Sequence, residues 1–126
     1  MHLVYGSGVG CVLLLVLAAA LAAEDEPKQQ DLRVLYVGNA ATPRGQAYAA
    51  FLQKHFRSAQ AAERKGFDPK QAEAFDVVLL DWSQDERPAK PLSPLGPRAA
   101  WGKPTVLLGS AGLLLSEAWD IHGGIG

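Results

Sequence analysis

The segment FDVVLLDWS most strongly limits the fold that this chain can adopt. Its centre, residues 77–80, holds four consecutive large aliphatic side chains. A strand alternates its side chains between two faces, so this run places apolar groups on both faces of a sheet. Such a strand needs cover on both sides, which is typical of a central strand in a parallel sheet between layers of helices. The segment therefore predicts an α/β architecture.

Earlier segments show a matching alternation of strands and helices. Residues 34–37 (VLYV) form an apolar run that stops at Gly38 and Asn39, which predicts a buried strand and a turn. The next segment spaces apolar side chains three and four residues apart, which predicts a helix. Its predicted apolar face consists of Tyr48, Phe51, Leu52, His55 and Phe56. The alanines that follow would extend this helix, but an alternating series favours a break near Arg57 and a short strand within residues 58–63.

The second half of the chain repeats the pattern. Asp68, Pro69 and Gln71 have the spacing of a capping box with proline at the first helical position, so a helix is expected to begin there. A proline-rich connection after Trp82 has room for one helical turn at residues 98–101. Residues 105–108 (TVLL) then predict another buried strand, and GLLLSEAW predicts the helix after it.

These elements predict a three-layer flavodoxin-like α/β fold with a parallel sheet in the order 2-1-3-4. Such sheets usually carry at least one strand more, so a domain truncated after the fourth strand is one expectation. Strand 105–108 would then lie at an edge and expose leucines, which favours association. We therefore expect a chain that either self-associates or belongs to a longer reading frame.

The amino terminus predicts a secreted or periplasmic protein. An apolar run from residue 9 to residue 21 precedes the small-x-small pattern Ala20-Leu21-Ala22 and then acidic residues, which is the layout of a signal peptide over residues 1–23. The alternative is an uncleaved membrane anchor, because residues 3–23 are long enough to span a bilayer. A polar linker is expected at residues 24–31 and the domain at residues 32–126.

Composition narrows the function further. The chain has 12 basic and 13 acidic residues, so no basic excess indicates nucleic-acid binding. Its single cysteine, Cys11, lies in the predicted signal peptide. A processed chain would therefore have no disulfide, no catalytic cysteine and no thiolate metal ligand. Asp120 and His122 lack a third ligand and do not form a zinc signature, so no metal site is predicted.

Three predicted loops meet at the carboxyl ends of the strands, where open parallel sheets bind ligands. They span residues 38–45, 81–83 and 109–112. Each candidate residue also suits an ordinary turn or helix cap. The candidate binding residues for an unknown small molecule or protein partner are Asn39, Thr42, Arg44, Asp81, Trp82 and Ser110.

Ser110 raises the question of catalysis. The sequence Leu108-Gly109-Ser110-Ala111-Gly112 resembles the nucleophile elbow G-x-S-x-G except at its first position. Asp120 and His122 follow in the hydrolase order, but both lie within or just after one helix, whereas the acid and base of that fold arrive on later strands. We expect Ser110 to cap the helix instead, and Gly112 to let helix and strand pack closely.

The segments RVLYVGNAATPRGQAYAAFLQKHF, AFDVVLLDWS and KPTVLLGSAG resemble the class I glutamine amidotransferase-like superfamily, particularly its exported ThuA-like members. In catalytic members a cysteine occupies the elbow where this chain has Ser110 and Ala111. The resemblance therefore implies a non-catalytic relative.

The hypothesis is thus an exported, non-enzymatic or degenerate amidotransferase-like domain that binds a small ligand or a partner. The alternatives are a serine hydrolase that uses Ser110 and a flavin binder with Trp82 stacked on the ring. No cofactor is predicted.

Overall fold

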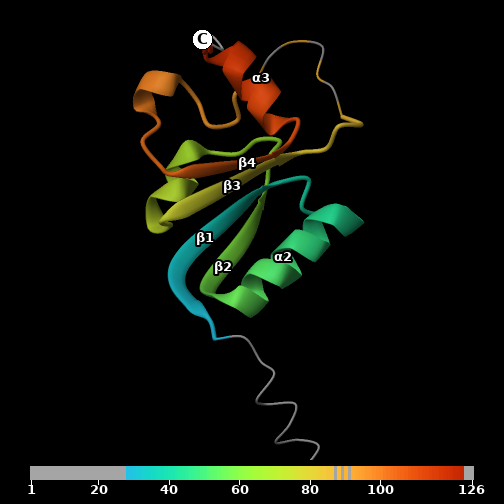
Figure 1. Ribbon diagram of the computed structural model, residues 1–126, viewed down its shortest axis with the longest axis vertical. Coiled ribbons are helices and arrows are strands. Elements are labelled where there is room, and N and C mark those ends of the chain that lie inside the picture. The colour runs from blue at the N-terminus through green and yellow to red at the C-terminus, as the bar shows by residue number, and fades with distance from the viewer. Residues whose placement is uncertain (1–27, 87, 89, 91, 124–126) are drawn as a thin grey trace, which may run out of the picture.

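The computed structural model describes residues 28–86, 88, 90 and 92–123. The predicted signal peptide and the first half of the predicted linker lie outside these residues. The described chain forms four strands, two α-helices and two 3₁₀ helices, η1 and η2 (Figure 1). None of the described helices is both long and apolar enough to cross a membrane.

The four strands form one all-parallel sheet in the order β2-β1-β3-β4, as predicted. They are β1 (Gln30–Gly38), β2 (Phe56–Glu63), β3 (Val77–Trp82) and β4 (Thr105–Gly109). Because all four strands are parallel, their carboxyl ends lie along the same edge of the sheet. Strand order reverses beside β1, so this edge contains the position at which such folds bind ligands.

The observed element boundaries differ from the predicted ones at the junction of α2 and β2 and at the start of β1. Helix α2 (Pro43–His55) ends one residue before Phe56, whose extended backbone already begins β2. Strand β2 therefore starts two residues before the predicted segment 58–63, and no turn separates it from the helix. Strand β1 likewise begins inside the segment that was expected to be a linker.

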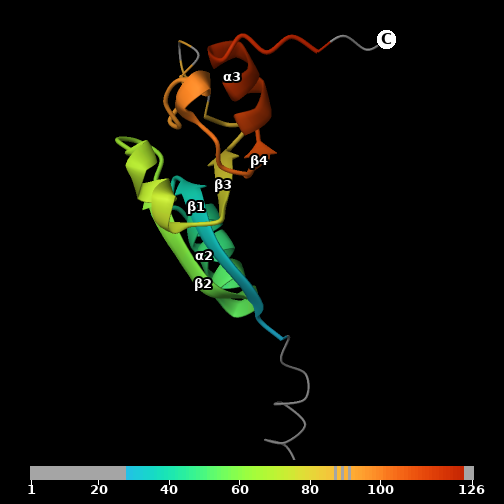
Figure 2. The same ribbon diagram turned by 90° about the vertical axis from the view of Figure 1, so that its left-hand side faces the viewer.

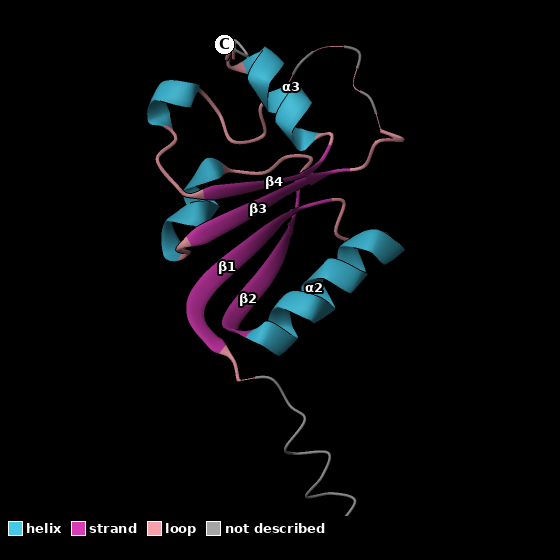
Figure 3. Ribbon diagram, in the orientation of Figure 1, coloured by secondary structure: helices cyan, strands magenta, loops and turns pink. Residues whose placement is uncertain are grey.

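The two crossovers after β2 and β3 contain 3₁₀ helices, η1 (Pro69–Ala74) and η2 (Arg98–Ala100). The predicted capping box is present: Asp68 accepts from the Lys70 N–H, and the Gln71 side chain bonds back to the Asp68 N–H. The predicted cap is thus confirmed, and the helix that it begins is a 3₁₀ helix of 6 residues. Helix α3 (Ala111–Ala118) follows β4. Figure 3 distinguishes these short helices from the strands that they connect.

Two apolar clusters pack on the two faces of the sheet. The smaller lies under α2 and contains Val34, Tyr36 and Leu52. The larger lies on the other face, where Leu35, Val37, Leu80 and Trp82 meet apolar side chains from η1, from α3 and from Leu95. Helix α2 contacts β1 and β2, and α3 contacts β3 and β4 (Figures 1 and 2). This is the predicted layered arrangement.

Helix α2 buries less of its apolar face than the spacing predicted. Leu52 is buried, but Phe51 is 55% exposed and packs against the ring of His55 with their centroids 4.3 Å apart. Helix α2 packs mainly on β1 and β2, so part of its apolar face stays uncovered. Val106, Leu107 and Leu113 are also exposed at the β4 end.

Candidate functional site

A cleft of about 150 Å³ lies at the carboxyl ends of the strands. Four of the six predicted binding residues line it, namely Asn39, Thr42, Arg44 and Asp81. The structure adds five more, Tyr36, Pro43, Arg64, Ser83 and Glu86. Trp82 and Ser110 are not part of its lining.

Asp81 is the buried centre of this cleft. Its side chain is only 3% exposed, and both carboxylate oxygens accept from Arg44, at 2.9 Å from Nε and 2.8 Å from Nη2. The Tyr36 hydroxyl donates a further bond of 2.7 Å to the same carboxylate. A bidentate arginine and a phenol together compensate the loss of hydration that a buried carboxylate suffers. Asp81 is thus held in the charged form. Its carboxylate bonds to Arg44 and Tyr36 and not to the backbone of the turn that follows β3.

The start of α2 places Arg44 over Asp81. Thr42 caps the helix: its Oγ1 accepts from the Gly45 N–H and donates to the Asn39 carbonyl at 2.6 Å. Proline at position 43 then fixes the first helical residue. The Arg44 guanidinium also lies 5.3 Å from the Tyr48 ring, which stacks on Tyr36. Thr42 therefore has the cap role that the sequence left open.

A glycine gives the Tyr36 hydroxyl its room. A Cβ atom at Gly38 would lie 2.5 Å from the hydroxyl oxygen of Tyr36. Without that atom, the phenol reaches along the strand to Asp81, which lies on the same face of β3. Gly38 therefore serves the buried network and not only the turn after β1.

A second ion pair borders the first. Arg64 pairs with Glu86, and its other terminal nitrogen donates to the Asp81 carbonyl at 3.0 Å. Glu86 also accepts from the Asn39 amide at 3.2 Å. Three separate loops are thereby joined through side chains. The two arginines and two carboxylates leave no net charge among these four groups.

Hydrogen bonding controls the ionisation of these groups. Burial by itself would raise the pKa of Asp81, but the bonds from Arg44 and Tyr36 outweigh it and hold the pKa below its ordinary value. The bond from Arg64 lowers the pKa of Glu86. Burial and the contact with Asp81 raise the pKa of Tyr36. At neutral pH both carboxylates are charged and the phenol is neutral.

Trp82 lies on the opposite face of β3, in the larger core cluster. It is 6% exposed, and the Arg64 guanidinium lies over its ring at 3.8 Å from the centroid. Trp82 therefore does not form a wall of this cleft, and it lines a hollow on the other face of the sheet instead. Side chains alternate along a strand, so Asp81 and its neighbour Trp82 point to different faces.

Ser110 begins α3 but does not cap it through its side chain, so that expectation is wrong. Its backbone N–H donates to the Trp82 carbonyl at 2.8 Å. Asp120 and His122 contact each other at 2.5 Å, yet both are exposed and lie past the far end of α3. The three residues of the hydrolase order are thus not gathered into one site.

The close approach that was expected at Gly112 occurs at Gly109 instead. Gly109 has a φ of +63°, and a Cβ atom there would lie 2.2 Å from the Trp82 carbonyl oxygen. At Gly112 a Cβ would meet Leu107 at an ordinary 3.7 Å. The close approach of chain segments at this corner therefore requires glycine at position 109, not at position 112.

Sequence reasoning missed Tyr36, Arg64 and Glu86. Arg64 directly follows the predicted strand within residues 58–63. The predicted site combined the loops after the other three strands, and including the loop after this strand would have identified Arg64. Tyr36 sits inside a strand that reads as apolar, and only its alignment with Asp81 across the sheet gives its hydroxyl a partner. Glu86 lies in a polar connection in which no spacing marks it.

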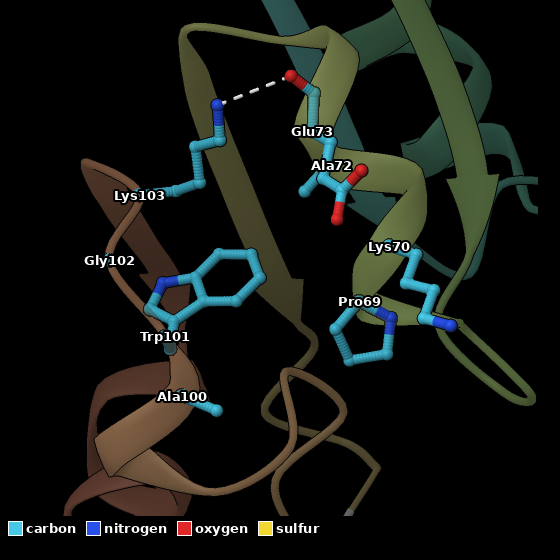
Figure 4. Close-up of a pocket in the computed structure, with 8 residues that line it drawn as sticks. All are labelled: Pro69, Lys70, Ala72, Glu73, Ala100, Trp101, Gly102 and Lys103. Atoms are coloured by element: carbon cyan, nitrogen blue, oxygen red, sulfur yellow. Dashed lines mark hydrogen bonds between the residues drawn. The ribbon is translucent and has the colours of Figure 1, made fainter.

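Another hollow, of about 480 Å³, lies near the amino ends of β3 and β4 between η1 and the segment before β4 (Figure 4). Trp101 and Pro69 line it, and Lys103 borders it. The Lys103 ammonium donates to the carbonyls of Phe75 and Glu73, at 2.6 and 3.4 Å. This hollow contains none of the predicted site residues. Within the described residues, no group of three or more side chains is placed to hold a metal ion.

Fold and site together define the class: an α/β domain with a flavodoxin-like parallel sheet and a paired ionic network at its carboxyl edge. A comparison with models of known protein families, with curated proteins and with solved structures gives no match to this chain.

Proposed function

We propose that this protein is a non-enzymatic binding domain, and that the cleft between Arg44 and Glu86 takes a small zwitterion or one polar side chain of a protein partner. A degenerate amidotransferase-like origin is part of the proposal. It is supported by the parallel sheet and by serine at the elbow where catalytic members have cysteine.

The observation that carries the proposal is the unused hydrogen-bonding capacity of the cleft. Arg44 directs Nε and Nη2 to Asp81, but its side chain is 44% exposed and its remaining N–H groups have no acceptor among the described residues. Glu86 is 37% exposed, and each of its oxygens has a lone pair beyond the bonds from Asn39 and Arg64. A ligand with an acceptor for Arg44 and a donor for Glu86 matches both groups and adds no net charge to a neutral network.

The size of the cleft supports a small ligand. Pockets for drug-sized molecules and cofactors span about 300–1,000 Å³. A cleft of about 150 Å³ is below that range, so it suits a group the size of an amino acid backbone. A flavin would need a larger pocket than this cleft, and Trp82, whose ring lies against Arg64, is not part of the cleft lining.

NMR titration of the nitrogen-labelled protein tests the proposal. We expect glycine to shift the Asn39 amide and Arg44 Nε–H signals more strongly than either acetate or methylammonium does. Glu86→Gln keeps the acceptor for Arg64 but removes a charge, and should weaken the response to glycine. Lys54→Gln, at the far end of α2, is the control. Equal responses to all three compounds, or none at millimolar concentration, would rule the cleft out as this kind of site.

A serine-directed fluorophosphonate probe separates the enzyme alternative. A non-enzymatic domain should not be labelled. Labelling that disappears in Ser110→Ala would favour a hydrolase, although no described histidine or acid bonds to Ser110.

We also propose that the protein is exported and processed near Ala22. The support is the apolar run followed by the small-x-small pattern and the acidic residues. Mass spectrometry of the protein recovered outside the cytoplasm should give a chain that starts at residue 23 or 24. An intact Met1 on a membrane-bound product would indicate an anchor instead.

A further inference from the structure

A hollow of about 490 Å³ opens on the face of the sheet opposite the cleft. Its apolar lining comes from Phe67, Trp82, Leu92 and Pro94, and two cations, Arg64 and Lys65, border it. Phe67 and Trp82 belong to the larger core cluster, whereas Leu92 is 57% exposed. The hollow thus combines an apolar floor that is fixed by the core with an apolar side that faces solvent.

The charges beside the hollow are not balanced. Arg64 is matched by Glu86 and by the Asp81 carbonyl. Lys65 is exposed and forms no ion pair with any described residue. The hollow therefore presents one uncompensated positive charge beside apolar surface.

Trp82 adds a second observation. Its indole Nε1 is buried and has no hydrogen-bond partner in the part of the chain that the structure describes. The other two tryptophans are satisfied: Trp101 donates to Thr105 at 2.9 Å, and Trp119 donates to the Gly96 carbonyl at 2.8 Å. A buried donor without an acceptor is uncommon and costs stability. Trp82 also lines the hollow, so its indole signal can report on binding there.

We propose that this hollow is a second binding site, separate from the cleft, for a small organic acid with a flat apolar body. The body lies against Leu92, Pro94 and Phe67, and the acidic group faces Lys65. The volume falls in the usual range for small-molecule pockets. The site does not depend on the proposed function of the cleft, although Arg64 borders both.

Binding of β-naphthoate to the purified chain tests this site, with the three indole N–H signals in a nitrogen–proton NMR spectrum as the readout. We expect the Trp82 signal to shift and the Trp101 and Trp119 signals to stay in place. β-Naphthylmethylammonium, which has the same body with the opposite charge, should bind about tenfold more weakly.

Two variants test the apolar contact and the charged contact separately. Leu92→Asp should abolish the shift of the Trp82 signal, and Lys65→Glu should weaken β-naphthoate binding about tenfold. Both residues are exposed, so both variants should fold, and unchanged Trp101 and Trp119 signals would verify it. Leu113→Asp and Lys54→Glu carry the same changes elsewhere and should bind normally.

The proposal is overturned if β-naphthoate shifts Trp101 or Trp119 instead of Trp82, if the two probes bind equally, or if Leu92→Asp binds as the unmodified protein does. Loss of β-naphthoate binding with an intact glycine response at Asn39 and Arg44 would remove this site and leave the cleft in place.

Discussion

At the scale of single residues, the buried carboxylate of Asp81 decides how the site is built. A charge in this position requires partners, and Arg44 and Tyr36 supply three hydrogen bonds from two elements. The same kind of bidentate pair occurs between Arg33 and Asp76 at the other end of the sheet, where both side chains are exposed. The two pairs differ mainly in burial, so they form a natural comparison.

Asp81→Asn should destabilise the fold by about 2 kcal/mol, because Arg44 and Tyr36 would lose a charged acceptor inside the protein. Asp76→Asn should cost clearly less, since water screens and replaces the exposed pair. Urea unfolding of both variants measures the difference. Equal losses would show that burial does not set the value of the Asp81 pair.

The pH dependence of stability follows from the same groups. The pKa values of Asp81 and Glu86 are lowered in the folded state, and hydrogen bonds from Arg33 lower the pKa of Asp76 to about 2. Their contribution is fully present above the unfolded pKa values of about 4 and is lost as the pH falls through the folded values. The raised pKa of Tyr36 has the opposite sign: its contribution is present below about pH 10 and is lost at higher pH.

We therefore expect the free energy of unfolding to fall below about pH 4, and the fall to be shallower in Asp81→Asn. Urea unfolding across the acid range provides the measurement. An acid limb in Asp81→Asn that is as steep as in the unmodified protein would mean that another group dominates.

At the scale of elements, the corner between β4 and α3 depends on one glycine. Gly109→Ala combines a left-handed backbone with a Cβ that would lie against the Trp82 carbonyl, and should cost about 3 kcal/mol. Gly112→Ala places a Cβ in ordinary contact and improves helix propensity, so it should be neutral or stabilising by about 0.5 kcal/mol. Thermal unfolding of the pair distinguishes the two positions. A neutral Gly109→Ala would show that the corner can rearrange.

At the scale of the whole molecule, the two halves of the sheet are covered unequally. Helix α2 packs on β1 and β2. Val106 on β4 lies on the same face of the sheet as Leu79, beyond the part that α2 covers. Val106 is 46% exposed on a strand with no charged residue. Strand β4 is also an edge of the described sheet, where unpaired backbone groups favour association.

We expect concentration-dependent self-association, and Val106→Lys should weaken it about tenfold by removing apolar surface and adding like charges. Phe51→Lys has a similar exposure on α2 and should leave it unchanged. Sedimentation velocity measures both. A monomer at all concentrations, or equal effects of the two variants, would contradict this expectation.

The sequence by itself determined the strands, their parallel direction and their order, because runs such as residues 77–80 can be buried only between layers and because crossovers are right-handed. It also identified three of the loops at the carboxyl edge, since glycine, proline and polar residues mark strand exits. Only the tertiary structure decided which side chains at that edge meet. Asp81 and Trp82 are neighbours in sequence but point to opposite faces, and Tyr36, Arg64 and Glu86 reach the cleft from three separate segments. Such contacts depend on register between distant strands, which local residue patterns do not encode.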